Sequence, residues 1–157
     1  DHKFNEYFTE QTAKSIHATF PNIDLITFTN VFAHIENLPQ LLANLQILIS
    51  DKTSLVIENH YLGAILDRSQ FDTFYHEHPR TYSLKSFEFI ARTLGMSIAK
   101  VDFPSRYGGN IRVTLNKAES EVALSNISTR ETEFIDSFKS LQSKYDTWKI
   151  ESQKVLA

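Results

Sequence analysis

One short run holds most of the side chains in this sequence that could move a proton. Residues 71–79 include the phenol of Tyr75, the carboxylate of Glu77 and the imidazoles of His76 and His78. Residues three and four apart share one face of a helix, so a helical run would project Tyr75 and His78 together. A phenol beside an imidazole suits general acid–base chemistry.

The same run carries signals for both ends of a helix. Ser69 followed three residues later by Asp72 is a capping-box type of start, and Pro79 disfavours helical geometry at the residue before it. The predicted helix has an apolar start and a polar end along one face, which points toward a cleft. That face comprises Phe71, Phe74, Tyr75 and His78. His76 faces away from it and is expected on the surface.

A metal site is the alternative use of these side chains. His60, His76, Glu77 and His78 are all potential ligands. The sequence has no His-Glu-x-x-His motif, and His76 and His78 would share a face only in a strand. We therefore predict no metal site.

The composition is that of one domain with a core. The chain has 157 residues, of which 41% are hydrophobic and 22% are charged. A formal charge of −3 without a long basic run argues against nucleic acid as a partner. No apolar run reaches the roughly 20 residues that span a membrane, and the absence of cysteine fits a cytoplasmic protein.

The hydrophobic pattern predicts an α/β fold whose sheet is mostly parallel. Residues 24–30 read as a parallel strand buried on both faces, and a leucine-rich helix follows Asn37 before a buried strand at 55–57. The pattern also predicts a strand at 4–8, helices at 9–17 and 84–94 with Gly95 as the C-terminal cap, and an antiparallel edge pair at 98–103 and 111–115.

The chain is predicted to end in a long helix that begins near Thr129. Its apolar residues follow heptad spacing and are Phe134, Phe138, Leu141, Tyr145 and Trp148. This helix either packs on its own domain or serves a partner, which would be a second copy of the chain or a further domain. If it serves a partner, the chain could be a non-catalytic assembly module.

Four short stretches carry a resemblance to a known family. They are residues 30–35 (NVFAHI), Glu58 with residues 61–63, residues 71–78, and residues 108–112 (GGNIR). Together they resemble the S-adenosylmethionine-dependent C-methyltransferases that act on nucleotide-linked 4-keto-deoxysugars. The likeness covers residues 1–117 and implies part of a Rossmann-like class I methyltransferase domain. Residues 118–157 would then form a helical segment that leads toward a further domain.

The resemblance implies an active site that removes a proton beside a ketone. Tyr75, Glu77 and His78 match the Tyr-x-Glu-His motif of this family, and His34 matches its active-site histidine. An imidazole, with an ordinary pKa of about 6.5, suits the base, and a phenol suits donation to the enolate. His78 is thus the preferred base, although Tyr75 could exchange roles with it.

Other roles follow from the same resemblance. Glu77 could orient an imidazole, His34 could contact the ketone or sugar hydroxyls, and Asn30 and Phe32 are expected to contact S-adenosylmethionine. Each also has a structural alternative, in which His34 caps a strand, Tyr75 packs in the core and Glu77 is solvated. The family has a histidine before its Gly-Gly turn, whereas this chain has Tyr107.

The main departure from the family is the missing cofactor turn. The four glycines are Gly63, Gly95, Gly108 and Gly109, so no Gly-x-Gly-x-x-Gly motif exists. Because the chain begins at Asp1 rather than Met, we expect that turn and the family's zinc-binding part to lie upstream. The chain alone is then expected to be inactive. Methylation at oxygen or nitrogen on the same fold is an alternative to C-methylation.

Overall fold

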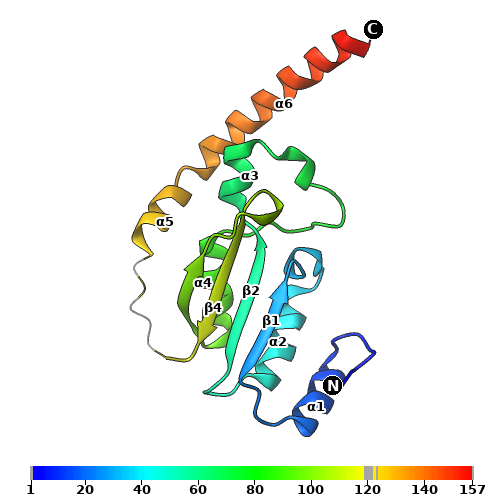
Figure 1. Cartoon of the computed structure of the whole chain (residues 1–157), viewed down its shortest axis with the longest axis vertical. Coiled ribbons are helices and arrows are strands. Elements are labelled where there is room, and N and C mark those ends of the chain that lie inside the picture. The colour runs from blue at the N-terminus through cyan, green and yellow to red at the C-terminus, as the bar shows by residue number, and fades with distance from the viewer. Residues whose placement is uncertain (1, 119–121, 123, 157) are drawn as a thin grey trace.

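The computed structural model describes residues 2–118, 122 and 124–156, and these form an α/β structure around one sheet (Figure 1). Parts of the predicted segment 118–157, namely residues 119–121, 123 and 157, lie outside the described residues. In chain order the elements are α1 (Glu10–Thr19), β1 (Leu25–Thr29), the 3-10 helix η1 (Phe32–His34), α2 (Leu38–Leu48), β2 (Ser54–His60), α3 (Leu62–Arg68), the 3-10 helix η2 (Phe71–Thr73), α4 (Leu84–Leu94), β3 (Ser97–Asp102), the 3-10 helix η3 (Arg106–Gly108), β4 (Asn110–Asn116), α5 (Ser125–Glu131) and α6 (Phe134–Leu156).

Local capping explains where the main helices begin and end. The side chain of Thr9 accepts a hydrogen bond from the Thr12 N–H at the start of α1, and that of Asn37 accepts one from the Gln40 N–H at the start of α2. Helix α4 ends at Gly95, whose φ of 65° is the left-handed conformation that glycine adopts readily. These three helices confirm the predictions at 9–17, after Asn37 and at 84–94.

The sheet is mixed, with strand order β1-β2-β4-β3. Strands β1 and β2 are parallel and are joined through α2, which confirms the predicted strand–helix–strand unit. Strand β4 is antiparallel to both of its neighbours, with Ile57 opposite Val113 on the β2 side. The prediction of a mostly parallel sheet was wrong, because only β1 and β2 are parallel and β4 is antiparallel to both β2 and β3. The predicted antiparallel pair at the sheet edge is confirmed, since β3 is the outer strand and pairs with β4.

Strand β1 differs from its prediction as a strand buried on both faces. Leu25, Thr27 and Thr29 are exposed, while Ile26 and Phe28 are partly buried against the core. In the described part of the chain β1 pairs with β2 alone, so it is an edge strand. The predicted strand at residues 4–8 was also wrong, since the structure has no strand there and Phe8 simply packs against the core.

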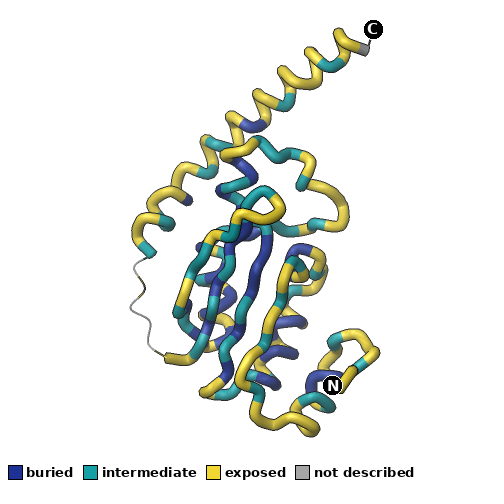
Figure 2. The backbone as a smooth tube through the Cα atoms, in the orientation of Figure 1, coloured by how far each residue is buried: buried dark blue, intermediate teal, exposed yellow. Residues whose placement is uncertain are grey.

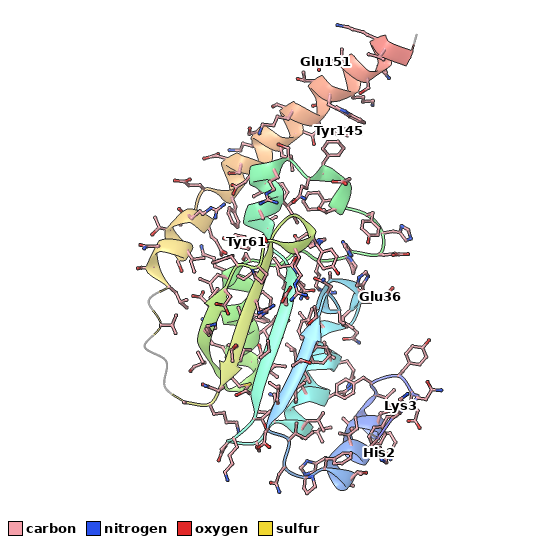
Figure 3. All side chains as sticks on the ribbon, in the orientation of Figure 1. His2, Lys3, Glu36, Tyr61, Tyr145 and Glu151 are labelled. Atoms are coloured by element: carbon pink, nitrogen blue, oxygen red, sulfur yellow. The ribbon has the colours of Figure 1, made fainter. Side chains whose placement is uncertain are left out.

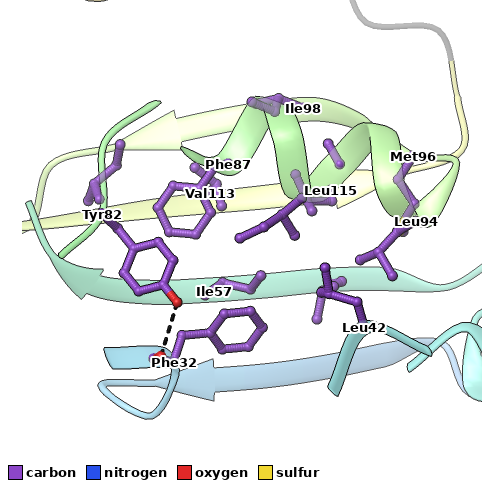
Figure 4. Packing of buried hydrophobic residues seen from close by; sticks show 14 of the residues in the cluster. Phe32, Leu42, Ile57, Tyr82, Phe87, Leu94, Met96, Ile98, Val113 and Leu115 are labelled. Atoms are coloured by element: carbon purple, nitrogen blue, oxygen red, sulfur yellow. Dashed lines mark hydrogen bonds between the residues drawn. The ribbon is translucent and has the colours of Figure 1, made fainter. Parts of the chain in front are cut away.

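The core lies between the sheet and the two helices α2 and α4, which cover the same face (Figures 1 and 2). Figure 4 shows Ile57 and Val113 of the sheet facing Phe87 of α4. The hydroxyl of Tyr82 donates a hydrogen bond of 3.0 Å to the carbonyl oxygen of Phe32 inside this core. Burial raises the pKa of Tyr82 to about 12, so its proton stays in place for this contact.

The predicted helix over residues 71–78 was wrong. Ser69 does not cap its start but closes the preceding helix α3, where it adopts a left-handed conformation with φ of 54°. Only the single turn η2 follows, and a further turn then joins the His78 N–H to the Tyr75 carbonyl at 2.9 Å. Helix α3 itself was not predicted.

The heptad residues of α6 pack in part on their own chain. Tyr145, labelled in Figure 3, has its ring centroid 5.3 Å from that of Phe71, and Trp148 lies 5.2 Å from the same ring. Phe138 lies 6.0 Å from Phe74. These contacts support the alternative in which α6 packs on its own domain, and they fix the segment that precedes Tyr75.

Glu131 joins three helices through one buried carboxylate. Its oxygens accept hydrogen bonds from the Leu84 N–H at 2.6 Å, the Lys85 N–H at 3.1 Å and the Tyr61 hydroxyl at 3.2 Å. The first two donors belong to the first turn of α4, whose N–H groups have no partner within the helix. Glu131 therefore attaches the C-terminal helices to the core.

We predict that Glu131→Gln lowers the free energy of unfolding by about 1–3 kcal/mol, because the amide would turn an NH₂ group toward a buried donor. Urea unfolding followed by circular dichroism measures this change. Glu133→Gln is the matched control, since Glu133 is exposed and only two residues away. Equal midpoints for the two variants would contradict the capping role.

Candidate active site

A cavity of about 270 Å³ opens where β1 and β2 end. Six residues line it, and they are Asn30, Ala33, Asn59, His60, His78 and Tyr107. Asn30 directly follows β1, His60 is the last residue of β2, and Tyr107 belongs to η3 just before β4. The carboxyl ends of adjacent parallel strands are the usual place for a ligand in α/β proteins.

Tyr75 and His78 form a hydrogen-bonded pair at this cavity. The Tyr75 hydroxyl lies 3.1 Å from Nε2 of His78, and Nδ1 of His78 lies 3.2 Å from the carbonyl oxygen of Thr73. A carbonyl oxygen can only accept, so Nδ1 carries the proton and donates it to Thr73. Nε2 of the neutral ring is then free to accept the Tyr75 proton, which is the arrangement of a base next to an acid.

Two further imidazoles surround His78. The ring centroid of His34 lies 4.6 Å from that of His78, and the centroid of His60 lies 5.8 Å from it. Burial lowers the pKa of His60, and the nearby charge of protonated His78 lowers it further. Near neutral pH His60 is therefore uncharged and can donate or accept one hydrogen bond.

Two contacts hold the loop after β1 against the segment that carries His78. The Arg80 guanidinium donates to the carbonyl oxygen of Ile35 and, at 2.8 Å, to that of Glu36, which is labelled in Figure 3. The hydrogen bond from the Tyr82 hydroxyl to the Phe32 carbonyl oxygen joins the same two segments. These bonds bring His34 beside His78, although 44 positions separate them in the sequence.

Glu58 organises the other side of the cavity. Its buried carboxylate accepts hydrogen bonds from Asn110 at 2.8 Å and from Arg112 at 2.6 Å, and Arg106 lies 3.0 Å away. Burial raises the pKa of Glu58, but the hydrogen bonds from Asn110 and Arg112 and the two guanidinium charges outweigh it, so the pKa is lowered. The backbone carbonyl of Glu58 accepts from the Asn30 N–H at 2.7 Å.

The structure brings together only some of the predicted site residues. Tyr75, His78 and His34 lie together, and Asn30 lines the cavity. Glu77 does not reach an imidazole of this cluster, because its side chain is 61% exposed and lies 3.8 Å from His76 on the surface. The Phe32 ring is fully buried in the core, so it does not line the cavity.

Four of the six cavity residues are absent from the site that the sequence predicts, and they are Ala33, Asn59, His60 and Tyr107. The sequence suggests His60 only as a metal ligand. Asn59 and His60 lie at the end of a strand adjacent to β1, which is the same signal that pointed to His34. Applying that argument to the second strand would have identified them.

The structure bears on the potential metal ligands and on the residues expected to contact S-adenosylmethionine. Across residues 2–118, 122 and 124–156, no three His, Asp or Glu side chains come together as metal ligands. Of the residues expected to contact S-adenosylmethionine, Asn30 faces the cavity and Phe32 does not.

None of the helices in the described ranges combines the length and apolar character needed to cross a membrane.

We predict that an NMR titration of the His60 ring has its midpoint below the ordinary value of 6.5 and that His78→Ala raises it. Since the unfolded chain binds this proton more tightly, the contribution of His60 to stability is present above about pH 6.5 and is lost as the pH falls through the lower folded pKa. A midpoint that His78→Ala leaves unchanged would contradict the coupling of the two rings.

Comparison with known proteins points to methyl transfer. No protein-family model matches the chain. Over 106 residues the chain is 28% identical to C-methyltransferase NovU of Streptomyces niveus, a stretch that covers 68% of this chain and 25% of that protein. The chain thus spans about a quarter of the length of the curated relative it matches. This similarity supports a relationship to methyltransferases in general, and the resemblance to the sugar-specific family stays a prediction.

Proposed function

We propose that this chain forms the substrate side of an S-adenosylmethionine-dependent C-methyltransferase that acts beside the ketone of a nucleotide-linked deoxysugar. The observation that carries the proposal is the contact of 3.1 Å between the Tyr75 hydroxyl and Nε2 of His78, next to His34. The similarity to a C-methyltransferase favours carbon over oxygen or nitrogen as the methylated atom.

The Tyr75–His78 pair would remove the proton from the carbon beside the ketone. The C–H bond breaks, the proton goes to this pair, and the electron pair moves into the ketone to give an enolate. Either Nε2 of His78 takes the proton directly, or Tyr75 takes it while passing its own proton to His78. The Thr73 carbonyl, which accepts from Nδ1, stabilises the imidazolium that results.

His34 and Asn30 are suited to holding the sugar. His34 is exposed and lies beside the base, so it could contact the ketone or a hydroxyl group. Asn30 faces the cavity from the end of β1, where its backbone has a φ of 54° and its N–H is bonded to Glu58. Glu77, on the surface, has no role in this scheme.

S-adenosylmethionine, when bound, would supply the methyl group that adds to the enolate carbon. The residues of this chain would make only some of the contacts to S-adenosylmethionine. Asn30 lines the cavity, but the sequence has no Gly-x-Gly turn at which the backbone could approach the cosubstrate closely. The remaining contacts would come from other parts of a longer protein. A nucleotide sugar as substrate is likewise a proposal for the whole protein.

We predict that Tyr75→Phe and His78→Gln in the full-length protein each lower methyl transfer to a nucleotide-linked 4-keto-deoxysugar by about 10²–10⁴-fold, the usual contribution of general acid–base catalysis. Product analysis by NMR would locate the new methyl group. His76→Gln is the matched control, because its side chain is 88% exposed and lies 3.8 Å from Glu77 on the surface. Full activity of both site variants, or a methyl group on oxygen, would refute the proposal.

We also predict that residues 1–157 alone bind S-adenosylmethionine weakly or not at all. The reason is the missing glycine-rich turn, since the four glycines lie at other positions. Isothermal titration calorimetry on this chain measures the affinity. A micromolar dissociation constant would mean that the described residues hold the cosubstrate in another way.

A further inference from the structure

Asn59 holds an unused hydrogen-bond donor at the cavity. The residue is 1% exposed and lines the cavity from the end of β2. Its Oδ1 accepts a hydrogen bond of 3.3 Å from the Ala33 N–H, but its Nδ2 has no partner among the residues that the structure describes. Leaving such a group unpaired is unfavourable, so a buried donor beside a cavity marks a place for an acceptor.

The orientation of this amide is fixed by its neighbour. Because the Ala33 N–H can only donate, the atom that faces it must be the oxygen of Asn59. The NH₂ group is therefore the free end. Ala33 itself lines the cavity, so the hydrogen bond that orients Asn59 lies at the cavity wall.

The surroundings of Asn59 select a neutral acceptor oxygen. None of the six described residues that line the cavity is a lysine or an arginine, so no permanent positive charge lies at its wall. A carbonyl oxygen needs only a donor and no countercharge in its ground state. An amide N–H can then also stabilise the negative charge that develops on that oxygen during a reaction.

We infer that Nδ2 of Asn59 donates a hydrogen bond to the ketone oxygen of the sugar, in the cavity that His78 also lines. This inference rests on the proposed function. When the C–H bond breaks and the proton passes to Tyr75 or His78, the charge of the enolate is on the oxygen that Asn59 contacts. Asn59 would thus select a keto-sugar over a sugar without that oxygen.

Equilibrium binding to the full-length protein, without S-adenosylmethionine, tests this inference. The probes are thymidine-diphosphate and uridine-diphosphate 4-keto-6-deoxyglucose, each compared with its 4,6-dideoxy analogue, in which a CH₂ group replaces the ketone. We expect the wild-type protein to bind the keto form of one of these pairs about tenfold more tightly, as one hydrogen bond predicts. Asn59→Asp should abolish that preference, because a carboxylate accepts but does not donate.

The Asn59→Asp variant keeps the structural contact, since its remaining oxygen can still accept from the Ala33 N–H. Asn126→Asp is the matched control, because it makes the same change at an exposed position on α5 and should keep the preference. If Asn59→Asp fails to fold, Asn59→Ala replaces it, because alanine removes the amide donor without adding a charge and should likewise abolish the preference. Equal affinity for the two probes in the wild type, or an unchanged preference in Asn59→Asp, overturns the inference.

Methyl transfer by the wild-type protein, measured in parallel, separates this inference from the proposed function. Methylation of the keto-sugar together with an unchanged preference in Asn59→Asp would overturn the role of Asn59 alone. A lost preference in Asn59→Asp without any methylation would support the contact and refute the proposed reaction. Wild-type protein that binds neither nucleotide sugar would overturn both.

Discussion

The candidate site depends on the ion pairs that the Glu58 carboxylate forms with Arg112 and Arg106. This carboxylate is buried on the central strand β2, where an unpaired charge would be costly. Arg112, its direct cross-strand partner on β4, and Arg106 of η3 neutralise it. Removing one partner of a buried ion pair typically costs 3–5 kcal/mol, since the other charge stays buried. The network therefore fixes β4 and the η3 turn against β2.

This constraint explains why the cavity lies where it does. The strand pairing that includes Glu58 and Arg112 aligns the last residues of β2 with the first residues of β4. Asn110 donates to the carboxylate of Glu58 and, at 3.3 Å, to the side chain of Asn30, so the end of β1 is joined to the same network. His60 and Tyr107, with ring centroids 6.2 Å apart, then line one wall together.

The segment that carries Tyr75 and His78 depends on aromatic packing and backbone contacts instead. Phe71 and Phe74 lie against the rings of α6, and Glu131 at the end of α5 bonds to the first turn of α4. These aromatic contacts with α6 hold the chain at Phe74, where the turn that ends at His78 begins. Arg80 secures the chain directly after it to the loop of His34. Tyr75 and His78 lie between these two supports.

Features that depend on near neighbours can be predicted from the sequence. Thr9, Asn37 and Gly95 cap helices through residues a few positions away. The contact of Tyr75 with His78 was expected for a helix. It forms in a turn instead, because a turn also brings residues three apart together. Three other features require the folded structure: β4 lies beside β2, His60 and Asn59 line the cavity, and Glu77 lies on the surface. Those outcomes depend on which strands pair and on which buried charge must be neutralised, and both are set by residues far apart in the chain.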